Sequence, residues 1–452
     1  MSEQFSIVGK PIMNAQLLGH VTGSTQYVDE ISFPGMLWMK AVRSPVPRGK
    51  IRRIDTSKAE KLPGVVRIIT AKDVPNNIHV NMAAIGIGPP DEPVLPEDEV
   101  NYKGEAICLV VAKDEETAAK AAEMVEVEIE ELPPVLDMEE ALKPSAPVIK
   151  KWGMNAFIFG SGMDGATRPG RPGRPLFLVK RGEVEIALKQ ADYVVEGSYL
   201  IPPIEHAPIE PHVCVAKPEP GQRLTIYTTT QAPYFVRDNV ATILNIPPSN
   251  IRVVAPAVGG GFGGKVDPEF EMQVAVAAMC VGRPVKWRWT REEEFTISTT
   301  RPAVKIEFQD ALSKDGLILG RKARLLHDSG AYTRTSPYGV IKATVNLSGP
   351  YYIPNVHYEG YCVYTNRQPS SAMRGYGVFE FSYAVELQME RDAKKLGIDS
   401  WEFRFKNAYR NGQVSATGKL IDDAYLIEVM KEAVALAGVS LPNHLLQMSS
   451  WG

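Results

Sequence analysis

The chain has 452 residues, and its 50 Lys and Arg against 53 Asp and Glu give a formal net charge of −3 at pH 7. This length suffices for about two to four domains, and the near-neutral balance gives no electrostatic reason to expect nucleic acid as a partner. The four cysteines are widely separated in the sequence, which argues against a disulfide framework, a cysteine-rich zinc module or an iron–sulfur cluster held by this chain.

Residues 1–150 have the pattern of one small α/β domain. Ala106–Ala112 is a continuous apolar run typical of a buried strand, and Asp114 is suited to cap the Ala-rich helix predicted over Glu115–Met124. Val125–Glu130 alternates apolar and acidic residues, which predicts a strand with one face in water. Two more strands are predicted over Leu37–Val42 and Val65–Ile69.

Residues 151–178 interrupt this pattern with repeated Gly, Pro and Arg, most densely over Arg168–Pro175. Such a run cannot form a helix interior or a central strand, so we predict a linker or a long surface loop. Binding of a phosphate or a partner by its three arginines is the alternative. Residues 179–452 return to alternating strand and helix patterns, and the predicted fold class is mixed α+β and α/β. Predicted strands cover Ala191–Tyr199, Leu224–Thr230, Ile251–Val254 and Pro284–Trp289, and predicted helices cover Pro268–Val281, Ser400–Asn407 and Asp423–Ala437.

The strongest local signal is Gly259–Lys265, which has five glycines in seven residues between a predicted strand and a predicted helix. Glycines let the backbone come close to a ligand, and N–H groups near a helix start can hold an anion or an oxo group. The run also satisfies the first part of the P-loop pattern, but Val266 stands where that loop needs Ser or Thr to hold Mg²⁺. Three interpretations remain, namely a tight turn, a nucleotide loop and a cofactor loop of another kind, and the rest of the chain favours the third.

Three further segments carry polar side chains that suit a binding site. Gln231 follows a predicted strand, and Arg374 lies in a loop of small residues, where its planar guanidinium could clamp a phosphate or an oxygen-rich cofactor. Either residue taken alone is also compatible with a structural role. Pro203–His212 contains two His and two Glu, but its prolines forbid the helical spacing of a metal site. A packed polar network is therefore favoured there over metal binding.

Taken in order, these motifs resemble the molybdenum-binding subunit of the xanthine dehydrogenase and aldehyde oxidase family, the molybdenum hydroxylases, over about residues 8–437. The motifs that resemble the family's α/β hammerhead domain are Gly23-x3-Tyr27-x-Asp29, Pro34-Gly35-Met36-Leu37, Val42-Arg43-Ser44-Pro45, Pro63-Gly64-Val65 and Tyr102-x-Gly104-Glu105. Those that resemble the first half of the molybdopterin-binding region are His206-x3-Glu210-Pro211, Thr230-Gln231, the glycine run, Asp328-x-Gly330-Ala331-Tyr332, Arg374-Gly375-x-Gly377 and Thr417-Gly418. Arg48 is a departure, because the family commonly has His at that place.

The resemblance implies roles for particular residues. Gln231 would hydrogen-bond an oxo ligand of molybdenum, and Arg374 would sit near the cofactor and hold its surroundings in place. The backbone that would approach the metal and the pterin dithiolene belongs to Gly260, Gly261, Phe262 and Gly263. Members of this family use no protein side chain as a direct molybdenum ligand, so no metal-ligand motif is expected.

The resemblance also predicts what this chain lacks. The family carries its general-base glutamate in the second half of the molybdopterin-binding region, and no Gly-Val-Gly-Glu motif occurs here. We therefore expect residues 179–452 to be the first molybdopterin-binding domain only, and the chain alone to be inactive. A split subunit, as in nicotinate dehydrogenase-type enzymes, would leave the base on a partner. The alternative is a truncated, non-catalytic scaffold that assembles with partners without binding cofactor.

The implied cofactor is molybdenum–molybdopterin in its cytosine dinucleotide form. The implied partners are a second molybdopterin-binding subunit, a [2Fe–2S] subunit and an FAD subunit, through which electrons would leave. The substrate would be a small molecule, an N-heterocycle or an aldehyde, hydroxylated with water-derived oxygen.

Three positions bear on the substrate. Val266 replaces a Glu that is common in xanthine-oxidising members, and Gly375 replaces the Cys that holds copper in the carbon monoxide dehydrogenase branch. Both differences argue against those substrates. Lys342 stands where xanthine-oxidising members commonly have Arg. It could bind an anionic substrate such as a heteroaromatic carboxylate, or it could simply face solvent.

The expected location is the cytoplasm. Met1–Phe5 shows no basic start followed by an apolar core, so no signal peptide is predicted. The longest apolar stretch, Val274–Val281, is too short to span a bilayer. Scattered cysteines also suit a reducing compartment.

Overall fold

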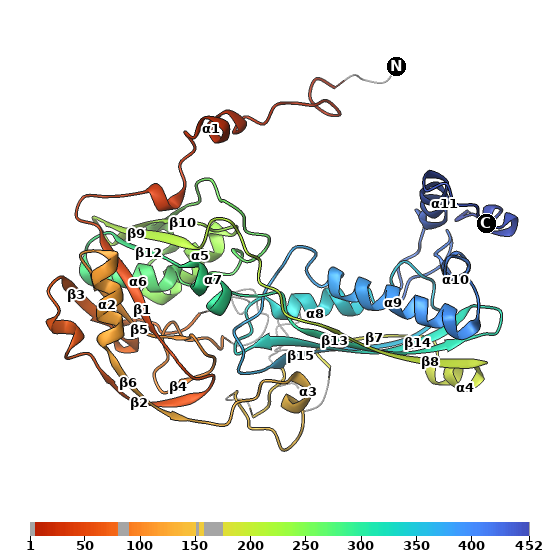
Figure 1. Ribbon diagram of the computed structural model, residues 1–452, viewed down its shortest axis with the longest axis horizontal. Coiled ribbons are helices and arrows are strands. Elements are labelled where there is room, and N and C mark those ends of the chain that lie inside the picture. The colour runs from red at the N-terminus through yellow and green to blue at the C-terminus, as the bar shows by residue number, and fades with distance from the viewer. Residues whose placement is uncertain (1–4, 80–89, 151–152, 158–174, 452) are drawn as a thin grey trace.

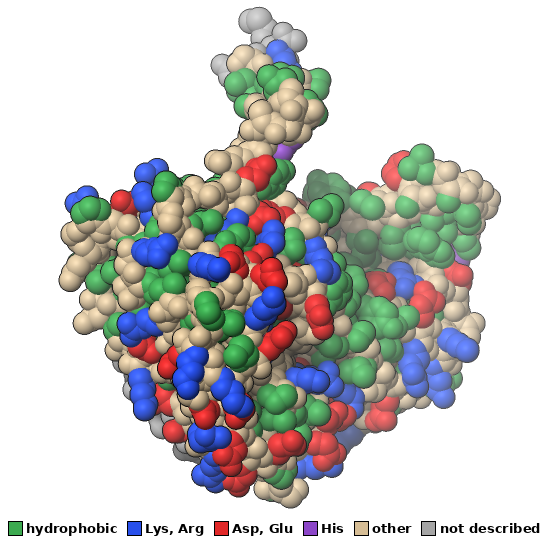
Figure 2. Space-filling model, turned by 60° about the vertical axis from the view of Figure 1, so that its left-hand side comes forward, with side chains coloured by type: hydrophobic (Ala, Val, Ile, Leu, Met, Phe, Trp, Pro, Cys, Tyr) green, Lys and Arg blue, Asp and Glu red, His purple; other side chains and the backbone are tan. Residues whose placement is uncertain are grey.

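The computed structural model describes residues 5–79, 90–150, 153–157 and 175–451. Figure 1 shows two lobes, each built around one large β-sheet with helices packed on it. An N-terminal arm that contains α1 (Leu17–Thr22) projects from the first lobe, and no residue of that helix is buried. In Figure 2 the arm stands clear of a surface on which acidic and basic side chains are interspersed. Among the described residues, no helix combines the length and hydropathy that a bilayer crossing needs.

A seven-stranded sheet forms the centre of the first lobe. In spatial order its strands are β11 (Ile251–Val254), β10 (Arg223–Thr228), β9 (Val213–Glu219), β12 (Val285–Arg288), β1 (Leu37–Arg43), β5 (Ala106–Ala112) and β3 (Val65–Ile69). β1 pairs with β12 in parallel, with Leu37 opposite Val285. Strands from the predicted segments 1–150 and 179–452 therefore share one sheet. A separate three-stranded sheet consists of β4 (Glu99–Val100), β2 (Gly49–Asp55) and β6 (Glu126–Glu131).

Helices cover both faces of the seven-stranded sheet. α6 (Glu271–Val281) and α5 (Pro233–Leu244) pack together, and α6 lies against β9. α2 (Glu115–Met124) packs against β1 and β5. Alternate residues of β5 pack into two different apolar clusters on opposite faces of the sheet. Leu109 belongs to the cluster that contains α6, and Val110 belongs to the cluster that contains α2. Burial on both faces explains why the sequence of β5 is apolar without interruption.

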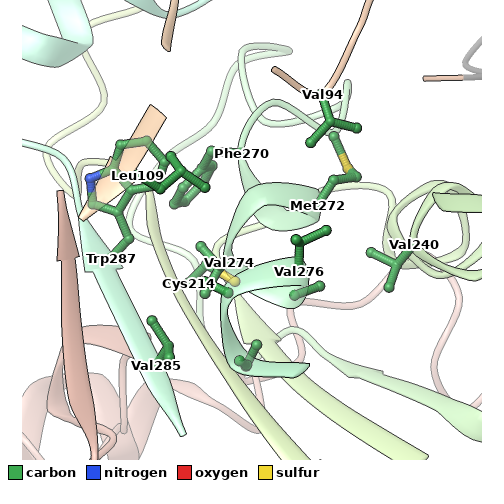
Figure 3. Packing of buried hydrophobic residues seen from close by; sticks show 14 of the residues in the cluster. Val94, Leu109, Cys214, Val240, Phe270, Met272, Val274, Val276, Val285 and Trp287 are labelled. Carbon is green, nitrogen blue, oxygen red and sulfur yellow. The ribbon is translucent and has the colours of Figure 1, made fainter. Parts of the chain in front are cut away.

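The core around α6 is the largest apolar cluster of the first lobe. The first eight residues of this helix are buried. They include Glu271, which accepts a hydrogen bond from Thr228, and Gln273, which donates to the Val94 carbonyl. Figure 3 shows Val274 and Val276 of the helix close to Cys214 of β9, with Phe270 and Trp287 beside them. This packing fixes the start of α6, and with it the end of the loop that precedes the helix.

A five-stranded sheet forms the second lobe. In spatial order its strands are β7 (Phe177–Arg181), β15 (Asn355–Tyr364), β14 (Ile318–Gly330), β13 (Val304–Leu312) and β8 (Tyr193–Ile201). Figure 1 shows α8 (Ser336–Val345) and α9 (Val378–Leu396) on one face of this sheet and α4 (Val184–Gln190) on the other. The other α-helices in the described ranges are α3 (Met138–Ala141), α7 (Arg291–Ile297), α10 (Ser400–Asn407), α11 (Leu426–Leu436) and α12 (Asn443–Leu446).

Several predicted elements agree with the structure. The strands 65–69, 106–112 and 251–254 and the helices 115–124 and 400–407 have the predicted bounds, and Asp114 caps its helix by accepting a hydrogen bond from the Thr117 N–H. The helix predicted from Pro268 begins later, at Glu271. The strand predicted over 191–199 lies two residues farther along, over 193–201. The Arg-rich segment 168–174 lies outside the described residues, and β7 already begins at Phe177, inside the segment predicted as a loop.

The two lobes are joined by buried polar contacts. The carboxylate of Glu105, next to β5, accepts hydrogen bonds from the Tyr332 hydroxyl at 2.5 Å and from the Asn101 N–H at 2.6 Å. Arg334 donates to Glu92 at 2.7 Å and lies 3.3 Å from Glu269. Because these groups are buried, losing the partner on the other lobe would leave a polar group unsatisfied. The contacts of Tyr332 with Glu105 and of Arg334 with Glu92 and Glu269 therefore hold the two lobes in a fixed relation.

The pKa of Glu105 makes the stability of this contact depend on pH. Burial raises the pKa of the Glu105 carboxyl from 4.5 to about 7. Between these two pH values the folded state binds more protons than the unfolded state. The contribution of Glu105 to the free energy of unfolding is therefore fully present below about pH 4.5 and is lost as the pH rises through about 7. Glu105→Gln removes this dependence. We expect the change in the free energy of unfolding between pH 4 and pH 8, measured by thermal unfolding, to differ from that of the wild type by up to roughly 3 kcal/mol.

The matched control is Glu128→Gln, because the Glu128 side chain on β6 is 67% exposed. This variant should keep the wild-type pH profile between pH 4 and 8. A Glu105→Gln profile parallel to that of the wild type would contradict the assignment.

Candidate functional site

The glycine loop, residues 259–265, lies in the connection between β11 and α6, in the strand-to-helix context that the sequence predicted. Gly260 and Gly263 have φ values of +104° and +105°, and Phe262 has +53°. Only glycine adopts the first two readily, whereas Phe262 carries local backbone strain. The Phe262 side chain remains 46% exposed. Contacts with the surrounding segments must therefore hold Phe262 in a backbone conformation that a non-glycine residue does not favour.

Close packing explains why the loop needs so many glycines. A Cβ atom added at four of its positions would lie between 2.5 and 2.7 Å from a neighbouring atom, and real Cβ atoms do not come this close. These clashes are of Gly259 with Glu210 Cβ, Gly261 with Gln231 Oε1, Gly263 with the Ala372 carbonyl oxygen and Gly264 with His206 Nδ1. The missing side chains let the loop backbone touch the segments that carry the other predicted site residues.

Gln231 is fixed from both ends by the glycine loop. Its backbone N–H donates to the Lys265 carbonyl at 2.8 Å, and its side-chain Oε1 accepts from the Gly263 N–H at 2.9 Å. Because a backbone N–H can only donate, the amide oxygen must face the loop and Nε2 must face away from it. Among the described residues Nε2 has no hydrogen-bond acceptor, and the side chain is exposed. The site thus presents an oriented hydrogen-bond donor.

Arg374 lies against the same loop. Its backbone N–H donates to the Phe262 carbonyl at 2.7 Å, and its own carbonyl accepts from Arg301 at 2.7 Å. Arg301 is buried and also pairs with Glu380 at 3.1 Å. The Arg374 backbone is therefore anchored on both sides, while its side chain is exposed. No sequence motif pointed to Arg301, although its partner Glu380 is in the first turn of α9.

Lys342 lies at the edge of this arrangement. It is exposed on α8, and its Cβ is 3.0 Å from where a Cβ of Gly377 would be. The structure thus brings Gln231, the glycine loop and the Arg374 backbone into direct contact, and it places Lys342 beside the end of the Arg374 loop.

The polar segment 203–212 forms a network of hydrogen bonds with the glycine loop and its neighbours. Glu210 accepts from the Gly259 N–H at 2.6 Å, and His206 Nε2 lies 2.8 Å from the Ala372 carbonyl oxygen. His212 Nδ1 lies 2.8 Å from Glu294. No cluster of three or more His, Cys, Asp or Glu with metal-ligand geometry occurs in the described part of the chain. This network supports the glycine loop from behind.

Lys265 argues against the nucleotide-loop interpretation. In a P-loop the lysine reaches the phosphates, but the side chain of Lys265 is fully buried. Its Nζ donates to the Glu210 carbonyl oxygen at 2.7 Å. Burial lowers the pKa of this amine, and the Glu210 carboxylate opposes that shift. The lysine therefore supports the loop and is not available to a phosphate.

Comparison with protein families gives two matches along the chain. Residues 168–408 match the molybdopterin cofactor-binding domain, and residues 22–133 match the a/b hammerhead domain of aldehyde oxidase and xanthine dehydrogenase. These matches agree with the predicted fold class, a hammerhead domain followed by a molybdopterin-binding region.

Two curated relatives cover the chain to different extents. The nicotinate dehydrogenase large molybdopterin subunit of Eubacterium barkeri is 33% identical over 437 residues, which are 96% of this chain and 97% of that protein. The xanthine dehydrogenase molybdenum-binding subunit of Escherichia coli is 34% identical over 432 residues, which are 93% of this chain and 54% of that protein. The chain thus spans nearly all of the first relative and about half the length of the second.

Two solved structures share the fold. The aldehyde oxidoreductase of Desulfovibrio gigas superposes with a TM-score of 0.85 at 30% identity, covering 94% of this chain and 46% of that one. The CO dehydrogenase of Oligotropha carboxidovorans gives a TM-score of 0.84 at 29% identity, covering 95% of this chain and 54% of that one.

The packing of the glycine loop predicts the effect of one added methyl group. Gly263→Ala places a Cβ 2.5 Å from the Ala372 carbonyl oxygen at a φ of +105°. We expect a loss of about 2 to 3 kcal/mol in stability, because both the clash and the backbone conformation must be accommodated.

Gly412→Ala is the matched control. Gly412 has a φ of +87° and no atom within 4 Å of its added Cβ, so only the cost of the conformation, about 1 kcal/mol, remains. Thermal unfolding measures both variants. Equal losses would show that close packing does not constrain the loop.

Proposed function

The chain belongs to the xanthine dehydrogenase and aldehyde oxidase family of molybdenum-dependent oxidoreductases, and we propose that it is the molybdopterin-binding subunit of a multi-subunit hydroxylase. The proposed reaction inserts water-derived oxygen into a carbon of an N-heterocycle or an aldehyde. The observation that carries this proposal is the oriented amide of Gln231, whose oxygen is bound by the Gly263 N–H and whose Nε2 is left to donate. We propose residues 1–150 as the hammerhead part and 179–452 as the first molybdopterin-binding domain.

The residues present fit a molybdenum–molybdopterin cofactor. When bound, that group would supply the two-electron oxidation of the substrate carbon. Gln231 would donate a hydrogen bond from Nε2 to an oxygen of the cofactor, and the Gly260, Gly261, Phe262 and Gly263 backbone would allow its close approach. The exposed Arg374 side chain, on a backbone anchored by Arg301, would bind beside it. We propose the cytosine dinucleotide form of the pterin.

A general base is proposed on a partner subunit. Three carboxylates beside the glycine loop and the Arg374 loop are largely buried, and each is held by a contact within the protein, although Oε1 of Glu210 and Oε2 of Glu380 have no hydrogen-bond partner among the described residues. Glu210 binds the Gly259 N–H, Glu380 pairs with Arg301 and Asp267 accepts from Ser371. A base must be within hydrogen-bond reach of the proton that it removes and be free to accept it. We propose that a second molybdopterin-binding subunit carries it, and that a [2Fe–2S] subunit and an FAD subunit of a cytoplasmic assembly remove the electrons.

Lys342 favours an anionic substrate. It is exposed beside the Arg374 loop, and the Arg374 side chain is exposed as well, so both positive charges are open to an anionic ligand. Val266 offers no carboxylate that would grip a purine, and Gly375 offers no thiolate for copper. A heteroaromatic carboxylate is the substrate class that this combination suits best.

Substitution of Gln231 tests the proposal. In the assembly purified with its partners, Gln231→Ala removes one preorganised donor, and we expect turnover per molybdenum to fall about ten-fold to a hundred-fold. Elemental analysis and steady-state kinetics give the two quantities. Turnover equal to that of the wild type would contradict the role of Gln231.

Two controls belong to the same experiment. Gln190→Ala, at the exposed end of α4, should leave turnover unchanged. The chain expressed alone should show no turnover, because the base is on a partner. A wild-type assembly without molybdenum would instead favour the alternative, a non-catalytic scaffold.

A further inference from the structure

A buried carboxylate lies directly behind the proposed site. Asp267 is 4% exposed, and its Oδ2 accepts hydrogen bonds from the Ser371 hydroxyl at 2.5 Å and from the Thr335 hydroxyl at 3.2 Å. The two hydroxyl oxygens are themselves 2.7 Å apart. Sequence reasoning missed this cluster, because its three members come from three distant segments and none belongs to a motif that suggests binding.

Each of these segments carries a residue of the proposed site. Asp267 follows the last residue of the glycine loop by two positions, and Ser371 precedes Arg374 by three. Thr335 is the N-cap residue of α8, the helix that carries Lys342. The three segments therefore meet at one oxygen atom of one side chain.

Tyr376 adds a second connection between two of the segments. It belongs to the Arg374 loop, and its hydroxyl donates to the Thr335 carbonyl at 2.5 Å. The Arg374 loop is thus tied to the start of α8 through Tyr376 and to the end of the glycine loop through Ser371 and Asp267. Gln231 joins the same assembly, because its N–H binds the carbonyl of Lys265, two residues before Asp267.

We propose that Asp267 is a positioning residue that holds the Arg374 loop and the start of α8 against the glycine loop, so that Gln231, Arg374 and Lys342 serve one site. This inference rests on the proposed function. Asp267 does not touch substrate or cofactor and acts only through the segments that it joins. A carboxylate is suited to this task, because one of its oxygens accepts from both hydroxyls, with the shorter bond to Ser371.

Stability alone does not account for a carboxylate at this place. Burial raises the pKa of the Asp267 carboxyl, and the hydrogen bonds from Ser371 and Thr335 oppose that shift. Buried polar groups of this kind are often replaceable by apolar residues without loss of stability. What this carboxylate supplies, and an apolar residue could not, is a fixed geometry for the segments around it.

The test uses the assembly purified with its partner subunits and compares Asp267→Asn and Ser371→Ala with the wild type. Molybdenum content, thermal unfolding, kcat and KM per bound molybdenum, and the electron paramagnetic resonance signal of the partly reduced metal are measured. Misplacement of reacting groups by about 1 Å can cost a hundred-fold in rate. We expect kcat/KM per molybdenum to fall about ten-fold to a hundred-fold in Asp267→Asn and less in Ser371→Ala, with an altered resonance signal and with most of the molybdenum retained.

Asp392→Asn is the matched control, because it makes the same carboxylate-to-amide change at a buried residue near the far end of α9, where its partner is Gln388. It should keep wild-type kcat/KM per molybdenum and the wild-type signal. If Asp267→Asn does not assemble, Ser371→Ala decides in its place. Variants that lose metal or stability but keep wild-type kcat/KM per molybdenum and the wild-type signal would overturn the positioning role. Absence of molybdenum from the wild type would contradict the proposed function itself.

Discussion

Close contact between the glycine loop and its neighbours is the constraint on which the rest of the site depends. The loop backbone touches Gln231 on one side and the Ala372 carbonyl on the other, at distances that leave no room for a Cβ. A hydrogen bond from the Gly263 N–H then orients the Gln231 amide, and one to the Phe262 carbonyl fixes the backbone of Arg374. A side chain at Gly261 or Gly263 would separate these segments and change the direction of every donor that they carry.

The charged residues behind the proposed site are buried and bonded, whereas those in front of it are exposed. Behind it, Lys265, Arg301 and Asp267 are buried, and each is bonded to groups that compensate for its lost hydration. In front of it, Arg374 and Lys342 keep exposed side chains. Polar groups that are already bonded make a rigid support, whereas the exposed ones are left for a ligand. This division supports a binding site more strongly than any one of these residues does alone.

Local patterns in the sequence were sufficient for some elements and not for others. The strand 106–112 was predictable because an apolar run buried on both faces leaves a clear signal, and the loop 259–265 was predictable because five glycines are rare outside sites of close approach. The pairing of β1 with β12 was not predictable, because it depends on residues far apart in the chain. α9 was missed because its buried face includes Glu380 and Asp392, which obscure its helical period. Roles that the family resemblance implied for Gln231 and Arg374 remain proposals.

The most direct test of the account is to locate the metal. Anomalous diffraction measured at the molybdenum absorption edge, on crystals of the assembly purified with its partner subunits, would place the metal without reference to activity. We predict one strong peak per chain beside the Gln231 side-chain amide and the backbone of Gly260–Gly263. A peak elsewhere in the chain, or a well-ordered glycine loop with only solvent beside Phe262, would contradict the account.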